Sequence, residues 1–462
     1  MNFWSKKSLI ILVLVVVLTF LTLFILKSTK TFNDVEGFKI FDCSSNYKKC
    51  DFKFIKNTVE NCNEWYLGKN SIKDLHCNLT IQSIDQVSIV GDAANHITSP
   101  ITKINYEVNI LTSLSKIFYD IILPHPLVAI GEISNQARSW DLEFLPDGSF
   151  LVTLKSGRLI HYKDDEFNIM QKIPVLHGEF TGLMGLAINP NYKKNNYIYL
   201  YYSTSFDNSF KKKDYFVMNR ISRFIYKEGK LSKEKILLDN IPGNKFHVGG
   251  RLEIGPDKKL YATTGDGIKE KSQDIHYLGG KILRMNLDGT IPSNNPFKNS
   301  YVYSRGHRNP QGLAWNPKTG NLYATEHGPW RYDEINLIKR GRNYGWPDMK
   351  CDEITNPDVT KIKNLIQPVM CFKNWTLAPS GAVFVDDKNH PWYGNLFVAG
   401  LRGRHLHRFV IDDNKLIQDE IFYLSKKTEK GILHPRIRDV EFYNGSIWIL
   451  SDVFGVAKLT PN

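Results

Sequence analysis

The chain has 462 residues, 42% hydrophobic and 12% aromatic, which is enough for one large folded domain and a smaller one. Its formal net charge of +13 comes from Lys and Arg that are spread along the chain. A nucleic-acid-binding protein usually concentrates its basic residues, so the charge pattern argues against nucleic acid as a partner. A solvated surface, anionic lipid or an anionic ligand remains compatible with it.

Residues 1–30 are typical of a signal anchor. An apolar run over residues 9–26, interrupted only by Thr19 and Thr22, follows two lysines. A helix of this length spans about 27 Å, close to the hydrocarbon core of a bilayer. The absence of an A-x-A-like cleavage site favours an uncleaved transmembrane helix over a removed signal peptide. The short N-terminal tail then predicts a membrane-anchored protein whose remaining chain is exported to the periplasmic or extracellular face.

Residues 31–125 are polar and rich in Asn and Lys, and we interpret them as a small domain of unknown fold. The segment 124–126, Pro-His-Pro, is typical of a linker. An even number of locally grouped cysteines indicates disulfides in an oxidising compartment, while free buried thiols are the alternative. Four cysteines allow three pairings, between which the spacing does not choose. The cysteines are Cys43, Cys50, Cys62 and Cys77 in this region, with Cys351 and Cys371 together in a later insertion.

One pattern recurs six times in the rest of the chain and predicts the architecture. Each copy is an apolar strand, a turn of Pro, Asp, Asn or Gly, and a second strand rich in Leu, Tyr, Val or Ile. Hairpin repeats spaced about 40–70 residues apart are typical of propeller blades. We therefore predict an all-β fold, a six-bladed β-propeller over residues 127–462, with loops from every blade meeting at one end of a channel. The copies begin at Trp140, Leu183, Gly250, Gln311, Ser380 and Arg438.

Three polar residues precede predicted inner strands. His247, in F-H-V-G-G-R-L, can act as a general base at the channel mouth, or be a hydrogen-bonded structural histidine. Arg308 and Asn309 lie in G-H-R-N-P-Q-G. The arginine offers a fixed fork for carboxylates or for charge that develops on oxygen, although a salt bridge between blades is the plainer role.

Two further motifs indicate anion and cation binding. Arg436 and Arg438 are two residues apart, so on a strand they would face the same side and suit paired recognition of an anion. A salt-bridged edge strand explains them equally well. In E-H-G-P, the carbonyls of Gly328 and Pro329 could ligate a hard cation such as calcium, or simply form a tight turn.

Taken together and in this order, the motifs resemble those of the soluble glucose dehydrogenase and aldose sugar dehydrogenase family. These enzymes are six-bladed propellers that use pyrroloquinoline quinone (PQQ). The resemblance covers residues 127–460 and rests on G-H-R-N-P-Q-G, E-x-G-P, D-E-I-N-L and N-Y-G-W-P at the family's spacing. It implies an oxidoreductase that oxidises the anomeric carbon of an aldose to a lactone. PQQ and Ca²⁺ would be its cofactors, and a quinone or other acceptor would take the electrons.

The resemblance also implies roles for single residues. His247 would be the base that takes the proton from the anomeric hydroxyl, and Arg308 would polarise the quinone oxygen that receives charge. Asn309 would lie beside the cofactor. The carbonyls of Gly328 and Pro329 would bind the calcium that holds PQQ.

The remaining cofactor contacts and one departure complete the prediction. Arg436 and Arg438 would bind the PQQ carboxylates, and Arg402 stands where the family's glucose dehydrogenases have a lysine. The family's G-Q-x-G reads G-E-F-T-G here, with Glu179 in place of an amide near the substrate, so the sugar is left open. The alternatives are a non-catalytic carbohydrate- or protein-binding propeller and a calcium-dependent propeller hydrolase such as a lactonase. The hydrolase needs acidic and amide side chains around a central metal.

Overall fold

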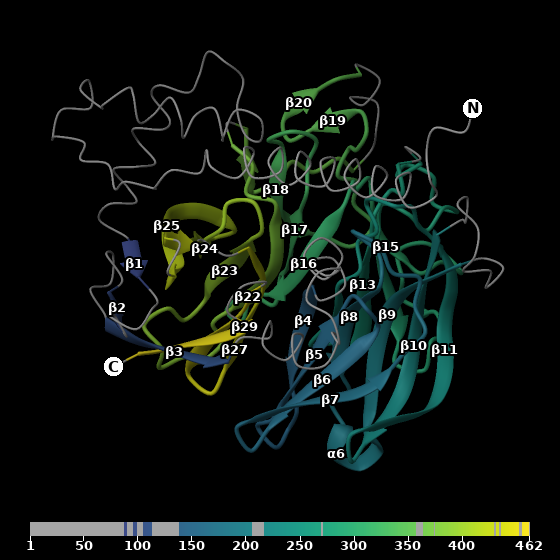
Figure 1. Cartoon of the computed structure of the whole chain (residues 1–462). Helices are drawn as coiled ribbons and strands as arrows, with labels where there is room; N and C mark the ends of the chain where they lie inside the picture. Colours follow the sequence, from purple (N-terminus) through teal and green to yellow (C-terminus); the bar gives the residue numbers. More distant parts are fainter. Residues whose placement is uncertain are drawn as a thin grey trace, which may run out of the picture. The chain divides into compact units, whose positions relative to one another are not determined.

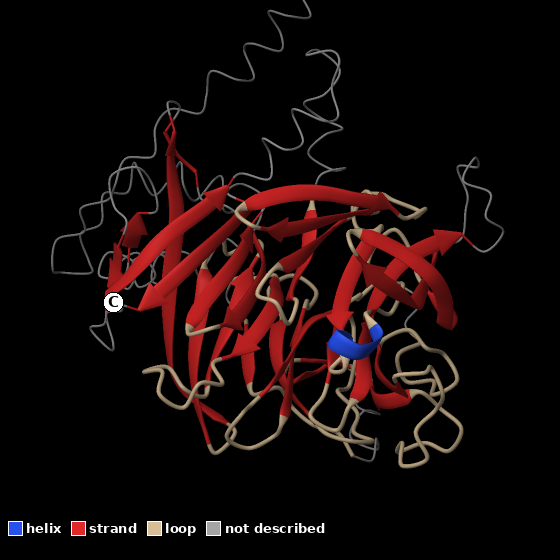
Figure 2. Ribbon diagram, turned by 90° about the horizontal axis from the view of Figure 1, so that it is seen from below, coloured by secondary structure: helices blue, strands red, loops and turns tan. Residues whose placement is uncertain are grey.

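The structure is a computed structural model, in which the helices and strands of the described residues are almost all β-strands (Figure 1, Figure 2). The predicted anchor and the cysteines before residue 87 lie outside these residues. Within the described part of the chain, no helix is long and apolar enough to span a bilayer. The residues described are 87–89, 96–98, 105–112, 138–205, 217–268, 271–356, 364–373, 375–428, 431–433, 436–451 and 455–461.

The chain divides into two compact units, and the propeller belongs to the unit of residues 43–427 and 433–462. Six of its sheets have four or more strands, and each is one blade. The blades are, in order, β4 (Ser139–Phe144), β5 (Phe150–Leu154), β6 (Arg158–Lys163) and β7 (Glu166–Lys172); β8 (Leu183–Ile188), β9 (Tyr197–Ser205), β10 (Val217–Lys227) and β11 (Lys230–Pro242); β12 (Leu252–Ile254), β13 (Lys259–Thr264), β14 (Lys281–Asn286) and β15 (Val302–Arg305); β16 (Pro310–Trp315), β17 (Leu322–Glu326), β18 (Asp333–Ile338) and β21 (Met370–Phe372); β22 (Pro379–Phe384), β23 (Asn395–Gly400), β24 (Leu406–Asp412) and β25 (Lys415–Thr428); β27 (Ile437–Tyr443), β28 (Ser446–Ser451), β29 (Gly455–Pro461) and β3 (Asn105–Thr112).

The prediction of a six-bladed propeller is confirmed, because each of the six sequence repeats forms the first two strands of one blade. The innermost strands β4, β8, β12, β16, β22 and β27 contact one another in this order, and β27 contacts β4, which closes the ring. The turn of the first repeat has the expected chemistry. Gly148 has a φ of +89°, which side-chain-bearing residues rarely adopt, and the Asp147 carboxylate accepts the Ser149 N–H at 3.1 Å.

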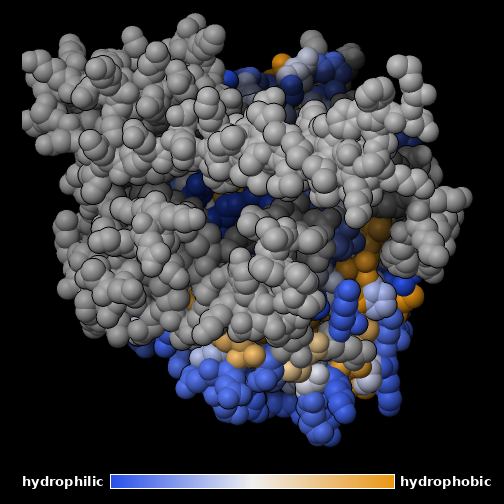
Figure 3. Space-filling view, viewed as in Figure 1, coloured by the Kyte–Doolittle hydropathy of each residue, from blue (hydrophilic) through white to orange (hydrophobic). Residues whose placement is uncertain are grey.

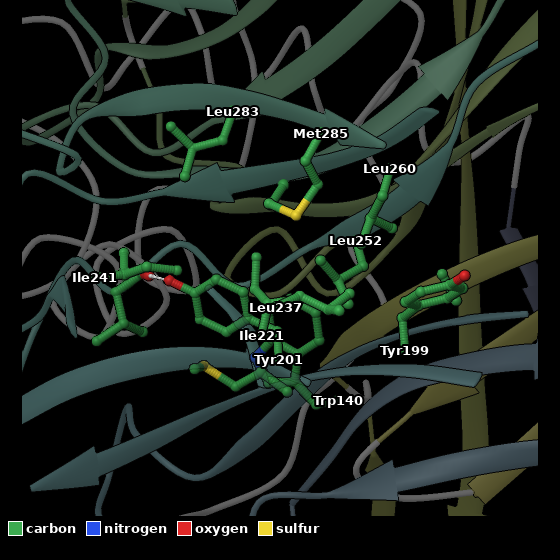
Figure 4. Close-up of a cluster of buried hydrophobic side chains, with 14 of the residues drawn as sticks. Trp140, Tyr199, Tyr201, Ile221, Leu237, Ile241, Leu252, Leu260, Leu283 and Met285 are labelled. Atoms are coloured by element: carbon green, nitrogen blue, oxygen red, sulfur yellow. Dashed lines mark hydrogen bonds between the residues drawn. The ribbon is translucent and has the colours of Figure 1, made fainter. Parts of the chain in front are cut away.

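The strands hold together because alternate residues of neighbouring blades are buried against one another. In the cluster of Figure 4, Tyr199 and Tyr201 of β9 pack with Leu283 and Met285 of β14, so blades two and three share one core. Trp140 of blade one reaches the same cluster. The described surface visible in Figure 3 is largely hydrophilic between smaller hydrophobic areas.

Blade six is completed by a strand from far earlier in the chain. β3 pairs antiparallel with β29, with Val108 opposite Leu459. β2 (His96–Thr98) extends this sheet, and β1 (Val87–Ile89) pairs in parallel with β25. These strands lie inside the segment 31–125 for which the sequence predicted a small domain, and that domain stays a prediction.

The remaining elements are short. They are α6 (Tyr192–Asn195), which follows β8, the hairpin of β19 (Met349–Lys350) and β20 (Glu353–Ile354), and β26 (Gly431–Leu433). The hairpin belongs to the insertion in blade four. A disulfide joins Cys351 to Cys371 there, which confirms that these two cysteines pair.

The pairing of the first two strands decides where a site can form. In each blade the start of the inner strand lies opposite the end of the second strand, as Pro310 lies opposite Glu326. The segment before every inner strand and the segment after every second strand therefore lie at the same end of the propeller, which we call the loop end. It brings together the segments 178–182, 244–251, 265–268, 305–309, 327–332, 401–405 and 436, each next to one of these strands.

Candidate active site

His247 lies at the loop end in blade three and is held by a carboxylate. Its Nδ1 lies 2.7 Å from Oδ1 of Asp266, which follows the second strand of the same blade. The other Asp266 oxygen accepts the indole N–H of Trp346 at 2.7 Å. The imidazole is partly exposed, with 19% of the side chain accessible, so Nε2 is left for a ligand. This arrangement orients a histidine as a base.

The surroundings of Asp266 stabilise its ionised form. Burial by itself would raise the pKa of Asp266, but the hydrogen bond and charge of His247 oppose it. The N–H groups of Ile268 and Trp346 add to this, and the pKa lies below its ordinary value. Asp266 is therefore an ionised acceptor that fixes the imidazole with its proton on Nδ1.

Arg308 lies next to this pair. Its carbonyl accepts the Asp266 N–H at 2.8 Å, and its guanidinium carbon lies 5.4 Å from the centroid of the Trp346 ring. One guanidinium nitrogen, Nη1, donates to the carbonyls of His327 and Gly328, both at 3.0 Å. Burial lowers the pKa of Arg308 from its ordinary value, although neighbouring carboxylates oppose the shift. A desolvated cation of this kind interacts strongly with negative charge.

The predicted calcium ligands line a pocket at the same place. Gly328 and Pro329 form its wall together with Arg308, Trp346 and Tyr332. The Gly328 carbonyl is the one that accepts from Arg308, so a cation would have to share or replace that contact. Among the described residues, no group of three or more His, Cys, Asp or Glu side chains is arranged to hold a metal. A calcium ion held here would depend on backbone oxygens.

Two buried carboxylates position this wall, and one of them, Glu326, also lines the pocket. Glu326 accepts the backbone N–H of Arg308 and, at 2.8 Å, the imidazole of His307. Asp333 accepts the N–H groups of Gly328 at 3.0 Å and Ala378 at 2.8 Å. Burial raises the pKa of Asp333 to about 6 despite these two hydrogen bonds. The loop that carries Gly328 is therefore fixed at both ends by buried acids.

His327 is a site residue that the sequence analysis did not single out. Burial and the positive charges of Arg438, Arg308 and His247 lower its pKa to about 3. Its Nε2 is buried, and it has no hydrogen-bond partner within the described part of the chain. The same is true of Nε of Arg308. Buried polar atoms are nearly always paired, so these two nitrogens indicate a polar partner supplied by a ligand.

Arg438 is connected to Asn309 through one amide. Its Nη1 donates to Oε1 of Gln311 at 3.3 Å and to Ser380 at 3.2 Å. The Gln311 amide donates to Oδ1 of Asn309 at 3.2 Å, and the same oxygen accepts the Gly249 N–H at 3.1 Å. The chain of contacts brings Arg438 of blade six and Asn309 of blade four together at the mouth.

The last two predicted cofactor residues lie at the loop end as well. Arg402 follows β23, and its N–H donates to the Leu377 carbonyl at 3.1 Å. Arg436 precedes β27 rather than lying on it, and the pairing register shifts between Ile437 and Asp439. Strand alternation therefore does not set the direction of Arg436, in contrast to the expectation that both arginines of the pair share a strand face.

The fold and the loop end define a class, a six-bladed propeller whose loop end carries several arginines and a carboxylate-held histidine. The family model for glucose/sorbosone dehydrogenases matches residues 136–457. The chain therefore belongs to the glucose/sorbosone dehydrogenase family, which supports the resemblance drawn from its motifs.

Known relatives agree with this assignment. Quinoprotein glucose dehydrogenase B of Acinetobacter calcoaceticus is 36% identical over 251 residues, which cover 47% of this chain and 52% of that protein. Aldose sugar dehydrogenase YliI of Escherichia coli is 29% identical over 335 residues, 68% of this chain and 86% of that protein. The structure is similar to that of the PQQ-bound aldose sugar dehydrogenase of Streptomyces coelicolor. The TM-score is 0.60 at 28% identity, with 77% of this chain and 98% of that chain covered.

Proposed function

We propose that the protein is a PQQ-dependent aldose dehydrogenase that oxidises the anomeric carbon of a sugar to a lactone. The observation that carries the proposal is the His247–Asp266 pair beside Arg308, at 2.7 Å between Nδ1 and Oδ1. Membership of a family of sugar dehydrogenases supports it. When bound, PQQ supplies an acceptor for the hydride that leaves C1 of the sugar. A quinone or other acceptor would later take the two electrons.

The protein's own residues would manage the proton and the charge. His247 Nε2 takes the proton of the anomeric hydroxyl as the C1–H bond breaks, so the carbon is left as the carbonyl of the lactone. Asp266 holds the other nitrogen and stabilises the imidazolium that forms. Arg308 faces the charge that develops on oxygen, where a buried cation is most effective.

The same residues fit the anionic cofactor and its metal. The buried Nε of Arg308, which lacks a partner among the described residues, can donate to a carboxylate or quinone oxygen. Arg402, Arg436 and Arg438 would add positive charge at the same end. We propose that the carbonyls of Gly328 and Pro329 hold Ca²⁺, since backbone oxygens suit this ion.

The test is reconstitution of the full-length protein with PQQ and calcium, assayed with several aldoses and an artificial electron acceptor. Turnover should require both additions and fall at least about a hundredfold in His247→Ala. His276→Ala, which alters an exposed histidine of the same blade, is the matched control. PQQ binding without His247-dependent turnover would favour a binding propeller, and failure to bind PQQ would exclude the proposed enzyme.

We also propose that a helix over residues 9–26 anchors the protein in a membrane, with the propeller exported. The apolar run and the Cys351–Cys371 disulfide support this, since disulfides persist in oxidising compartments. Alkaline extraction of cell membranes tests the anchor, and protease added to intact spheroplasts or cells tests the exported side. Release of the protein by alkali would contradict the anchor.

A further inference from the structure

Two phenylalanines at the loop end lie in contact with each other and with solvent. Phe180 is 36% exposed and Phe246 44% exposed, and their ring centroids are 5.1 Å apart. They come from different blades, Phe180 from the segment before β8 and Phe246 from the segment before β12. We call them the aromatic pair. Large apolar side chains that gather on a surface indicate a contact with a ligand.

Exposure of this kind is concentrated at the loop end. Within the described part of the chain, seven large hydrophobic side chains are exposed, and four of them lie in loop-end segments, so the exposed apolar surface is not scattered at random. These four are Phe180, Phe246, Ile268 and Trp330.

Contacts with the buried side chain of Lys155 hold the segment that carries Phe180. The ammonium of Lys155 is buried, donates to the Glu179 carbonyl and lies 5.7 Å from the centroid of the Phe180 ring. Gly182 packs directly on Lys155, since a Cβ there would collide with the Lys155 carbonyl oxygen. The buried ammonium of Lys155 therefore faces the Phe180 ring and holds it at the surface.

Phe246 is covalently next to the proposed base. His247 has a φ of +53°, and its carbonyl accepts the Gly267 N–H at 3.2 Å, which fixes the turn between the two residues. Ile268, two residues after the aspartate that holds the imidazole, is 49% exposed at a φ of +61°, a conformation that is rare for a β-branched residue. Its N–H donates to Asp266 at 2.8 Å. Exposed apolar side chains are thus present in the segments of both members of the His247–Asp266 pair.

Sugars present apolar C–H faces as well as hydroxyl groups, and such faces pack on aromatic rings through burial of apolar area. A sugar unit whose anomeric hydroxyl meets His247 lies next to Phe246, which precedes that histidine in the chain. The aromatic pair is solvent-exposed beside it, so it would contact a unit that extends outward. We propose that the aromatic pair binds the second sugar unit of a disaccharide or longer oligosaccharide whose reducing end is oxidised. This inference rests on the proposed function.

The experiment compares glucose with maltose, a disaccharide that ends in glucose, using full-length protein loaded with PQQ and calcium. In the double variant Phe180→Ala/Phe246→Ala, the ratio of kcat/KM for maltose to that for glucose should fall about tenfold, mainly through KM. Phe246→Trp should keep the ratio. Ile236→Ala removes a side chain of similar exposure, 45%, from the outer strand β11 and should not change it.

Equal losses for both sugars would overturn the inference, as would an effect confined to the KM of the electron acceptor. If the wild-type protein oxidises neither sugar, the proposed function has failed, and calorimetric titration with the two sugars then tests the aromatic pair alone. Tighter binding of maltose than of glucose that is lost in the double variant and kept in Ile236→Ala supports the inference. No binding of maltose by the wild-type protein overturns it.

Discussion

The propeller contains two buried charged clusters that differ in what their arginine contacts. The central cluster lies where inner strands meet, and in it Arg251 contacts the carboxylates of Asp141 and Asp439. These acids also accept backbone N–H groups, from Leu186 to Asp141 at 2.8 Å and from Leu142 to Asp439 at 2.9 Å. The central cluster therefore ties the inner strands of blades one, two, three and six to one another.

At the loop end the arginine contacts backbone carbonyls instead of carboxylates. Nη1 of Arg308 donates to two carbonyls, and its Nε has no partner within the described residues. The comparison shows two uses of a buried cation. An arginine that is paired with carboxylates links the blades, whereas one that contacts carbonyls keeps its charge for an anionic ligand.

The largest effect is expected on stability, when a substitution breaks the central cluster. Arg251→Met would leave two carboxylates buried without their cation, so we expect a loss of about 3–5 kcal/mol in the free energy of unfolding. Thermal and denaturant unfolding measure it. Lys163→Ala, which removes an exposed ion pair with Asp147 at 3.4 Å, is the control and should change little. An unchanged Tm for Arg251→Met would show that this cluster does not hold the blades.

The next effect should appear in catalysis rather than in stability. Arg308→Met removes the cation that would face developing charge, so kcat should fall about 10²–10³-fold while Tm changes little. Arg340→Met, at an exposed arginine that donates to the Asn294 carbonyl at 3.0 Å, should leave both unchanged. A loss of stability like that of Arg251→Met would place Arg308 in the framework, and the contrast between the clusters would disappear.

A smaller effect is expected at the carboxylate that holds the base. Asp266→Asn keeps the size of the side chain but removes the charge that fixes His247, so kcat should fall about 10–100-fold with PQQ content unchanged. The absorbance of bound PQQ and the rate at saturating aldose measure the two quantities. A variant that loses PQQ but keeps its rate per bound cofactor would assign Asp266 to cofactor binding instead.

The last effect depends on pH and concerns an acid that lines the pocket. Burial, with the charge of Glu326 second, raises the pKa of Glu334 to about 8 from an ordinary value of 4.5. The folded protein thus retains a proton that the unfolded chain releases between these values, so this group's contribution to stability is present below pH 4.5 and is lost as pH rises toward 8. Glu334→Gln should remove that dependence.

The measurement is Tm at pH 5 and pH 8 for the wild-type protein and for Glu334→Gln. The decrease on going to pH 8 should be smaller in the variant by about 5 °C. The amide can still accept the Cys351 N–H, which donates to Glu334 at 2.9 Å. Equal decreases in both proteins would show that Glu334 is ionised when folded.

The sequence predicts the inner half of each blade well, because a hairpin is a local feature. The turn and the alternation of the copy at Trp140 are complete within residues 140–154, and the structure forms β4 and β5 there. Outer strands depend on partners that are distant in sequence. Nothing in residues 105–112 indicates that they pair with residues 456–461, and the sequence analysis placed them in a separate region.

The site residues also divide into those that a sequence motif predicts and those that only the fold identifies. His247 and Arg308 stand in motifs, so their positions could be predicted, but the partner of the imidazole could not. Asp266 lies in T-T-G-D-G, where an Asp beside two glycines is equally typical of a turn. His327 is defined only by the arginines that the fold brings around it.

The pairing of β3 with β29 has a consequence for how the protein is made. β3 leaves the ribosome long before β29 is synthesised, so blade six cannot close during most of translation. The edge of β3 is unpaired during that interval and is open to pairing with strands of other chains, because unpaired edges recruit foreign strands. Blade six is complete only when β29 has been made.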